Sequence, residues 1–218
     1  MQTHHVIAID GPAASGKSSV ARALARRLGY VYVNTGAMYR AVTWLVLERG
    51  IDPANSEAVL RAVAEADLEC STEEGQSVMR INGVDPGEQL QAQRINAAVS
   101  TVATLPEIRR RLVEMQRAYI ELGNLVMEGR DIGSAVFPET PYKFYIDASP
   151  EVRAQRRAKQ GLQDSIQQRD KQDSSRRASP LIIAEDAHVI DSSHLTVDGV
   201  VGEIIGRLKL KGLLPEAF

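Results

Sequence analysis

The sequence contains little of what secreted, membrane-spanning or nucleic-acid-binding proteins depend on. A single cysteine, Cys70, excludes a disulfide within the chain and suits a reducing compartment. No apolar run reaches the length of about 18 residues that a membrane-spanning helix needs. With 26 Lys and Arg against 28 Asp and Glu, the net charge of −2 gives no overall attraction to nucleic acid. These absences predict a cytoplasmic protein whose partners include neither a membrane nor a nucleic acid.

Short apolar runs alternate with amphipathic helical stretches, which predicts an α/β protein built around a mainly parallel sheet. The length of 218 residues suits one large domain, and the composition, 44% hydrophobic and 25% charged, is ordinary for a globular protein. Between about 67 and 88, two short strands and the turn dipeptide Asn82-Gly83 predict a small antiparallel insert. Apolar runs predict strands at 6–10, 30–33, 125–127, 144–146 and 188–190, and helical spacing predicts helices at about 20–28, 37–49, 95–104, 106–119 and 197–208.

Directly after the first predicted strand, the chain fits the phosphate-loop pattern G-x-x-x-x-G-K-[ST] at every specified position. Glycines let such a loop curl so that consecutive N–H groups point at phosphate oxygens, and the helix that follows favours negative charge. Lys17 is expected to reach the β- and γ-phosphates, and the Ser18 hydroxyl to bind Mg²⁺. A glycine-rich turn with a chance lysine leaves the flanking strand and helix unexplained. The pattern predicts that a nucleoside triphosphate binds to Gly11, Pro12, Ala13, Ala14, Ser15, Gly16, Lys17 and Ser18, with Ser19 beside them.

Three further segments contain candidate arginines: 34–40 has Arg40, 128–133 has Arg130, and the polar tract from 153 to 177 has several. For each segment taken alone, a solvated arginine or a surface ion pair is the alternative interpretation. In a parallel sheet, however, the first two segments follow strand ends that lie beside the phosphate loop, where open α/β folds bind ligands. Arginines that meet a triphosphate site predict a second phosphorylated substrate. A nucleoside monophosphate kinase, with an arginine-rich lid that closes over both phosphate chains, fits this pattern.

Four motifs together resemble the bacterial cytidylate kinases, P-loop nucleoside monophosphate kinases: G-P-A-A-S-G-K-S-S at 11–19, T-G-A-M-Y-R at 35–40, E-G-R-D-I-G at 128–133, and R-D-x-x-D-S-x-R at 169–176 followed by S-P-L. The resemblance extends from Ile7 to about Ile205. It implies a monomer with a three-layer P-loop core (3–35, 123–152 and 180–218), a monophosphate-binding subdomain (36–122) containing the insert, and a short lid at about 153–170. The implied reaction moves the γ-phosphoryl group of ATP to CMP or dCMP, in pyrimidine nucleotide metabolism.

The resemblance also implies roles for individual residues. Lys17, Arg130, Arg153 and Arg157 would be catalytic, the last two as lid residues on the moving phosphoryl group. The acceptor phosphate would lie on Arg40, Arg130 and Arg176, with Thr35 and Tyr39 beside it, and the ribose on Arg169 and Asp173. Ser100, Arg109 and Asp131 would read the base, since a carboxylate can accept from the cytosine amino group whereas uracil presents a carbonyl there. The family commonly has an acidic residue at the position of Asn34.

Three other functions remain as alternatives. A regulatory GTPase needs N-K-x-D and D-x-x-G motifs, and the sequence contains neither. A nucleic-acid-binding ATPase could use Arg109-Arg110-Arg111 as a basic patch, but Glu107 and Glu114 lie on the same predicted helix and the chain is net acidic. A related kinase with another acceptor differs only in the base-reading residues and the insert. We expect no general base, because the acceptor phosphate is already an anion.

Overall fold

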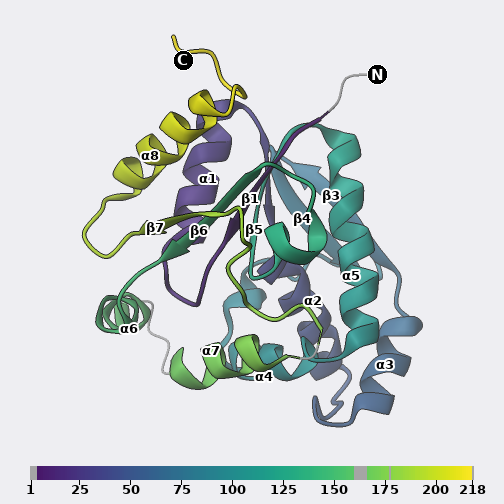
Figure 1. The fold of residues 1–218 in the computed structure, drawn as a ribbon. Helices are drawn as coiled ribbons and strands as arrows, with labels where there is room; N and C mark the ends of the chain where they lie inside the picture. Colours follow the sequence, from purple (N-terminus) through teal and green to yellow (C-terminus); the bar gives the residue numbers. More distant parts are fainter. Residues whose placement is uncertain (1–3, 160–165, 177, 218) are drawn as a thin grey trace.

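The computed structural model describes residues 4–159, 166–176 and 178–217, with the backbone alone over 166–169. These residues form a seven-stranded sheet in the order β3-β4-β2-β5-β1-β6-β7. Figure 1 shows this sheet with the helices packed around it. The pairs β2–β5, β5–β1, β1–β6 and β6–β7 are parallel, which confirms the predicted α/β class. The strands are β1 (Val6–Asp10), β2 (Val31–Asn34), β3 (Leu68–Glu73), β4 (Gln76–Ile81), β5 (Leu125–Gly129), β6 (Tyr142–Asp147) and β7 (His188–Asp191).

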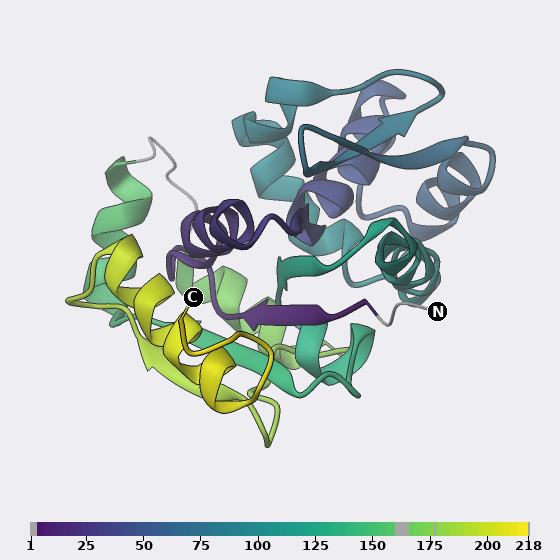
Figure 2. The same ribbon diagram turned by 90° about the horizontal axis from the view of Figure 1, so that it is seen from above.

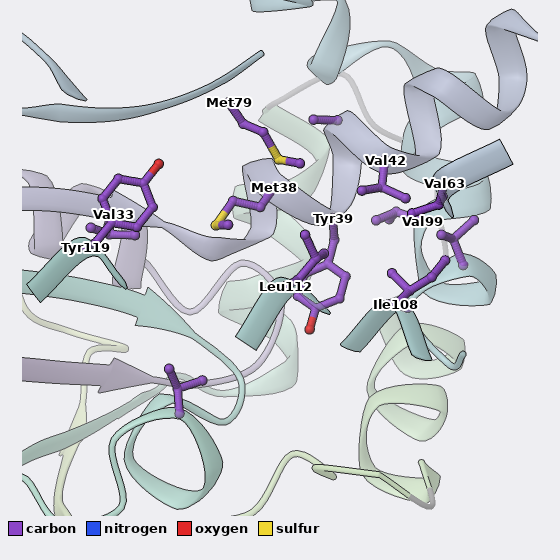
Figure 3. Packing of buried hydrophobic residues seen from close by; sticks show 14 of the residues in the cluster. Val33, Met38, Tyr39, Val42, Val63, Met79, Val99, Ile108, Leu112 and Tyr119 are labelled. Atoms are coloured by element: carbon purple, nitrogen blue, oxygen red, sulfur yellow. The ribbon is translucent and has the colours of Figure 1, made fainter. Parts of the chain in front are cut away.

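Helices cover both faces of the sheet, because its central strands are apolar on both sides. In β1, Ile7 and Ile9 belong to the core beneath α1 and α8, whereas Val6 and Ala8 belong to the core beneath α2 and α5. Figure 3 shows the second of these cores from close by, with Met38, Tyr39 and Leu112 among its members. The helices are α1 (Lys17–Leu28), α2 (Thr35–Glu48), α3 (Ser56–Ala64), α4 (Gln93–Val102), α5 (Pro106–Ala118), α6 (Pro150–Lys159), α7 (Ile166–Ser175) and α8 (Val197–Leu210).

The segment for which the sequence predicts an insert forms the antiparallel hairpin β3–β4. Its strands are joined at Glu74 and Gly75, both with positive φ, and Asn82-Gly83 makes a second tight turn after β4. β4 also pairs in parallel with β2, at Tyr32 and Gln76, so the hairpin extends the central sheet, which the sequence pattern did not indicate. Figure 2 shows the hairpin and α3 at one end of the molecule and α8 at the other. Across the described ranges, we find no helix that is both long and apolar enough to span a membrane.

Candidate functional site

A cavity of about 830 Å³ opens at the carboxyl ends of β1, β2 and β5, where their loops meet residues of α4, α6, α7 and α8. Most of the residues singled out from the sequence line it. They are Ala13, Ala14, Ser15, Gly16, Lys17, Ser18, Ser19, Thr35, Tyr39, Arg40, Ser100, Arg109, Arg130, Asp131, Arg157, Asp173 and Arg176. Gly11 and Pro12 complete the loop behind this wall, and Arg153 contacts the loop at Ala13. The side chain of Arg169 lies outside the described residues.

The phosphate loop is held tightly against its neighbours. Gly11 has a φ of +154°, and a Cβ there would come within 2.1 Å of the carbonyl oxygen of Ile146, so only glycine fits. Lys17 is buried at the start of α1, and its Nζ donates to the carbonyl of Pro12 over 3.0 Å. The loop therefore presents its backbone N–H groups and one ammonium group at a helix N-terminus, which is an anion-binding arrangement.

Glu128 is a functional candidate that the sequence reasoning missed. Its buried carboxylate accepts a hydrogen bond of 2.8 Å from the Ser18 hydroxyl, across from the phosphate loop at the end of β5. The motif E-G-R-D could have identified it, since an acid at the end of the strand beside β1 can help to bind a metal ion held by the loop serine or threonine. Hard oxygen ligands of this kind suit Mg²⁺, which commonly takes one or two protein groups and completes its shell with phosphates and water.

The turn after β5 has no room for a side chain at its glycine. A Cβ on Gly129 would lie 2.6 Å from the Thr35 hydroxyl, which donates to the carbonyl of Glu128 over 2.8 Å. Thr35 therefore fixes the ends of β2 and β5 together rather than reaching far into the cavity. Asn34 caps α2 by accepting from the N–H of Ala37 over 3.0 Å. Because asparagine and aspartate are equivalent helix caps, Asn34 preserves the geometry of the loop without adding a charge.

At one end of the cavity, Arg109 and Asp131 form an ion pair with side chains only 3% and 7% exposed. The Arg109 guanidinium lies 5.3 Å from the centre of the Tyr39 ring, and it also donates to the carbonyl of Ala103. Burial raises the pKa of the Tyr39 hydroxyl to about 12, so the ring remains neutral. Ser100 lines this part of the wall from α4. A planar cation, a carboxylate and a hydroxyl thus converge, as the recognition of a polar base requires.

Close to the Arg109–Asp131 pair, two arginines of the cavity wall, Arg130 and Arg176, are paired with a carboxylate of α7. Arg130 donates from Nε to Asp173 over 2.8 Å, and Arg176 lies 3.3 Å from the same carboxylate. Burial disfavours the charged form of Arg130, but the charge and hydrogen bond of Asp173 outweigh it and raise the pKa. For Arg176, burial prevails and lowers the pKa. Two cations that share one carboxylate retain the capacity to bind a further anion.

Helix α6 brings arginines into contact with the phosphate loop. Arg153 is buried and donates to the carbonyl of Ala13 over 3.2 Å and to Asp170 over 2.5 Å. Asp170 in turn lies 3.5 Å from the N–H of Ala13. Arg156, on the same helix, donates to the carbonyl of Ser15 and to the hydroxyl of Ser192. Leu195 and Val197, both partly exposed, line the cavity beside it and were not predicted as site residues.

Comparison with known proteins identifies the family. The cytidylate kinase family model matches residues 7–210. A curated cytidylate kinase of Limosilactobacillus fermentum is 41% identical over 215 residues, covering 93% of this chain and 95% of its own. A cytidylate kinase of Corynebacterium efficiens is 44% identical over 212 residues, covering 92% of each chain. A third, of Pelotomaculum thermopropionicum, is 42% identical over 214 residues, covering 93% of this chain and 95% of its own.

Proposed function

The chain belongs to the cytidylate kinase family and phosphorylates CMP with ATP, and we propose that the 830 Å³ cavity holds both nucleotides with their phosphates facing one another. The ATP phosphates would lie on the phosphate loop and on Lys17. The CMP phosphate would lie on Arg40, Arg130 and Arg176. The observation that carries this proposal is the meeting of the loop, the arginines and the Arg109–Asp131 pair along a single wall. Because the sequence resembles those of the bacterial cytidylate kinases, we propose that dCMP is also an acceptor.

The donor end is supported by the loop and by α6. Backbone N–H groups and Lys17 favour the β- and γ-phosphates, while Arg153, Arg156 and Arg157 approach from the lid side. We place the adenine beside Leu195 and Val197, because these apolar side chains line the cavity next to Arg156. Displacement of water by the closing lid would protect the γ-phosphoryl group from hydrolysis.

The same site fits Mg²⁺. Ser18 and Glu128 would hold it, directly or through water, because their oxygens lie within hydrogen-bond distance and face the phosphate loop. When bound, the ion would neutralise charge on the β- and γ-phosphates. Lys17 and the arginines would orient the two phosphate chains in line and stabilise the charge of the transition state. We propose no general base.

The base end explains a preference for cytosine. Asp131 would accept from the cytosine amino group, and Arg109 and Ser100 would donate to its ring nitrogen and carbonyl oxygen. Uracil would place a carbonyl oxygen against the Asp131 carboxylate, which costs about 1–3 kcal/mol for an unsatisfied buried group. Asp173 would contact the ribose together with Arg169, once the CMP phosphate has replaced Asp173 as the partner of Arg130. A monomeric, cytoplasmic enzyme remains the prediction from the sequence.

The decisive experiment measures coupled-assay turnover with CMP, dCMP, UMP and AMP, for the unchanged enzyme and for Asp131→Asn. We expect CMP and dCMP to be preferred, and the amide introduced at position 131 to narrow the preference for CMP over UMP by about tenfold or more. Glu139→Gln, an exposed change outside the cavity wall, serves as the control. Equal turnover of UMP and CMP by the unchanged enzyme would contradict the roles given to Ser100, Arg109 and Asp131.

A further inference from the structure

A carboxylate is buried at the end of the central strand β1, directly before the phosphate loop. Asp10 is 6% exposed and accepts two hydrogen bonds of 2.8 Å, from the backbone N–H groups of Ile132 and Gly133. A carboxylate is costly at this depth unless its oxygens are satisfied. Both of these backbone donors lie on one element, the helical turn Ile132–Val136, which follows the neighbouring strand β5.

Asp10, on β1, caps the N-terminus of this turn from a different part of the chain. The residue before the turn, Asp131, makes no side-chain capping bond, so the first N–H groups of the turn depend on Asp10. The turn is also fixed from its other side. A Cβ on Gly133 would lie 3.1 Å from the Lys143 side chain and 3.4 Å from Oδ2 of Asp10. The turn therefore has little freedom to shift relative to β1.

We propose that Asp10 is a positioning residue for base selection. By holding the N–H groups of Ile132 and Gly133, it sets the place of the preceding Asp131, whose carboxylate must meet the amino group of the base. The proposal rests on the base-reading role given to Asp131 above. Because Asp10 adjoins Gly11, the same side chain also fixes the acceptor-binding turn relative to the donor loop. Lys17 and Asp131 are the charged groups that act on it electrostatically.

The test is Asp10→Asn, which keeps the shape but turns an amide N–H toward one of the two backbone donors. We expect the ratio of kcat/KM for CMP to that for UMP to fall about tenfold, through a higher KM for CMP, with the KM for ATP changed less than about twofold. A general loss of packing would lower turnover of both nucleotides and would leave this ratio unchanged.

Thr140→Val is the matched control, because it also removes a buried polar contact to β1. The Thr140 hydroxyl donates to the carbonyl of Val6 over 2.5 Å, at the end of the strand far from the site. This variant should lose stability without losing selectivity. Should Asp10→Asn fail to fold, Gly133→Ala displaces the turn from its own side and should reproduce the selectivity loss.

Asp131→Asn distinguishes the positioning role of Asp10 from the base-reading role of Asp131 on which it rests. Loss of selectivity in Asp131→Asn and in Asp10→Asn or Gly133→Ala, with Thr140→Val unaffected, supports the positioning role. Loss in Asp131→Asn with full selectivity in the Asp10 and Gly133 variants overturns the positioning role and leaves the base-reading role intact. Full selectivity in Asp131→Asn overturns both.

Discussion

Two sets of ion pairs at the cavity hold their charges in different ways: the base end, Arg109 and Asp131, and the phosphate end, Arg130 and Arg153 with their partners on α7. At the base end, Arg109 and Asp131 are almost completely buried and belong to elements packed into the core, α5 and the turn after β5. At the phosphate end, the Arg153–Asp170 pair is 11% and 21% exposed, and the Arg130–Asp173 pair is 19% and 8% exposed. The carboxylates of the phosphate end come from α7, which lies beside α4 in Figure 1.

The difference follows from the ligands. A phosphate is an anion, so it can take the place of a carboxylate on an arginine, and we propose that phosphates of the substrates replace the α7 carboxylates on Arg130 and Arg153. A base is neutral, so it can hydrogen-bond to Arg109 and Asp131 without replacing either partner of their ion pair, and the pair can be buried permanently. On this proposal the base end keeps its ion pair when substrate binds, whereas the arginines of the phosphate end exchange partners. Changes at the first end should therefore affect stability and selectivity, and changes at the second should affect turnover.

The largest effect is expected at the phosphate end. Arg130→Ala should lower kcat/KM for CMP about 1000-fold, because it removes charge stabilisation from the acceptor phosphate, while the free energy of unfolding changes by about 1 kcal/mol. Steady-state kinetics and urea unfolding measure the two quantities. Arg61→Ala, at an exposed pair with Glu57 on α3, is the control. Unchanged kcat/KM in Arg130→Ala would remove the acceptor phosphate from this end of the cavity.

Local sequence patterns were sufficient to predict the elements that carry the site, but not how their charges pair. The phosphate loop and the strands around it follow from short-range signals, and they form where expected. The helical spacing over 106–119 predicted the helix that became α5, yet it could not show that Arg109 on this helix is buried against Asp131, 22 positions away. Arg111 and Arg117 are equally basic in sequence but bind backbone carbonyls. Partners that are distant in the sequence therefore decide which arginines line the cavity and which only join parts of the fold.

A second experiment addresses the base end. Arg109→Met keeps much of the side-chain volume but leaves Asp131 without its ion-pair partner in the interior, which should cost about 3–5 kcal/mol of unfolding free energy. Arg94→Met, at an exposed pair with Glu48, should cost about 1 kcal/mol or less. Chemical denaturation of both variants measures the contrast. Equal losses would show that burial does not distinguish the Arg109 pair from a surface pair.

The pH dependence of stability tests the buried carboxylate beneath the base end. Burial raises the pKa of Asp10 from its ordinary value of 3.8 to about 7. Between these values the folded protein keeps a proton that the unfolded chain has released, so this group makes stability fall as the pH rises from about 4 to about 7. Asp10→Asn should remove up to about 1.4 kcal/mol per pH unit of this slope. Identical slopes in both proteins would show that Asp10 does not titrate in this range.

The smallest effect tests whether a carboxylate of α7 competes with substrate phosphates for the same arginine. Asp170→Asn removes the negative charge that Arg153 and the phosphate loop contact in the absence of substrate. If Asp170 competes with the ATP phosphates, the KM for ATP should fall about threefold, and added salt should narrow the difference. Glu185→Gln, an exposed change that also removes one negative charge, controls for net charge. A raised KM for ATP in Asp170→Asn would instead make Asp170 a support that holds Arg153 in place for the donor, and both ends of the cavity would then be organised before substrate binds.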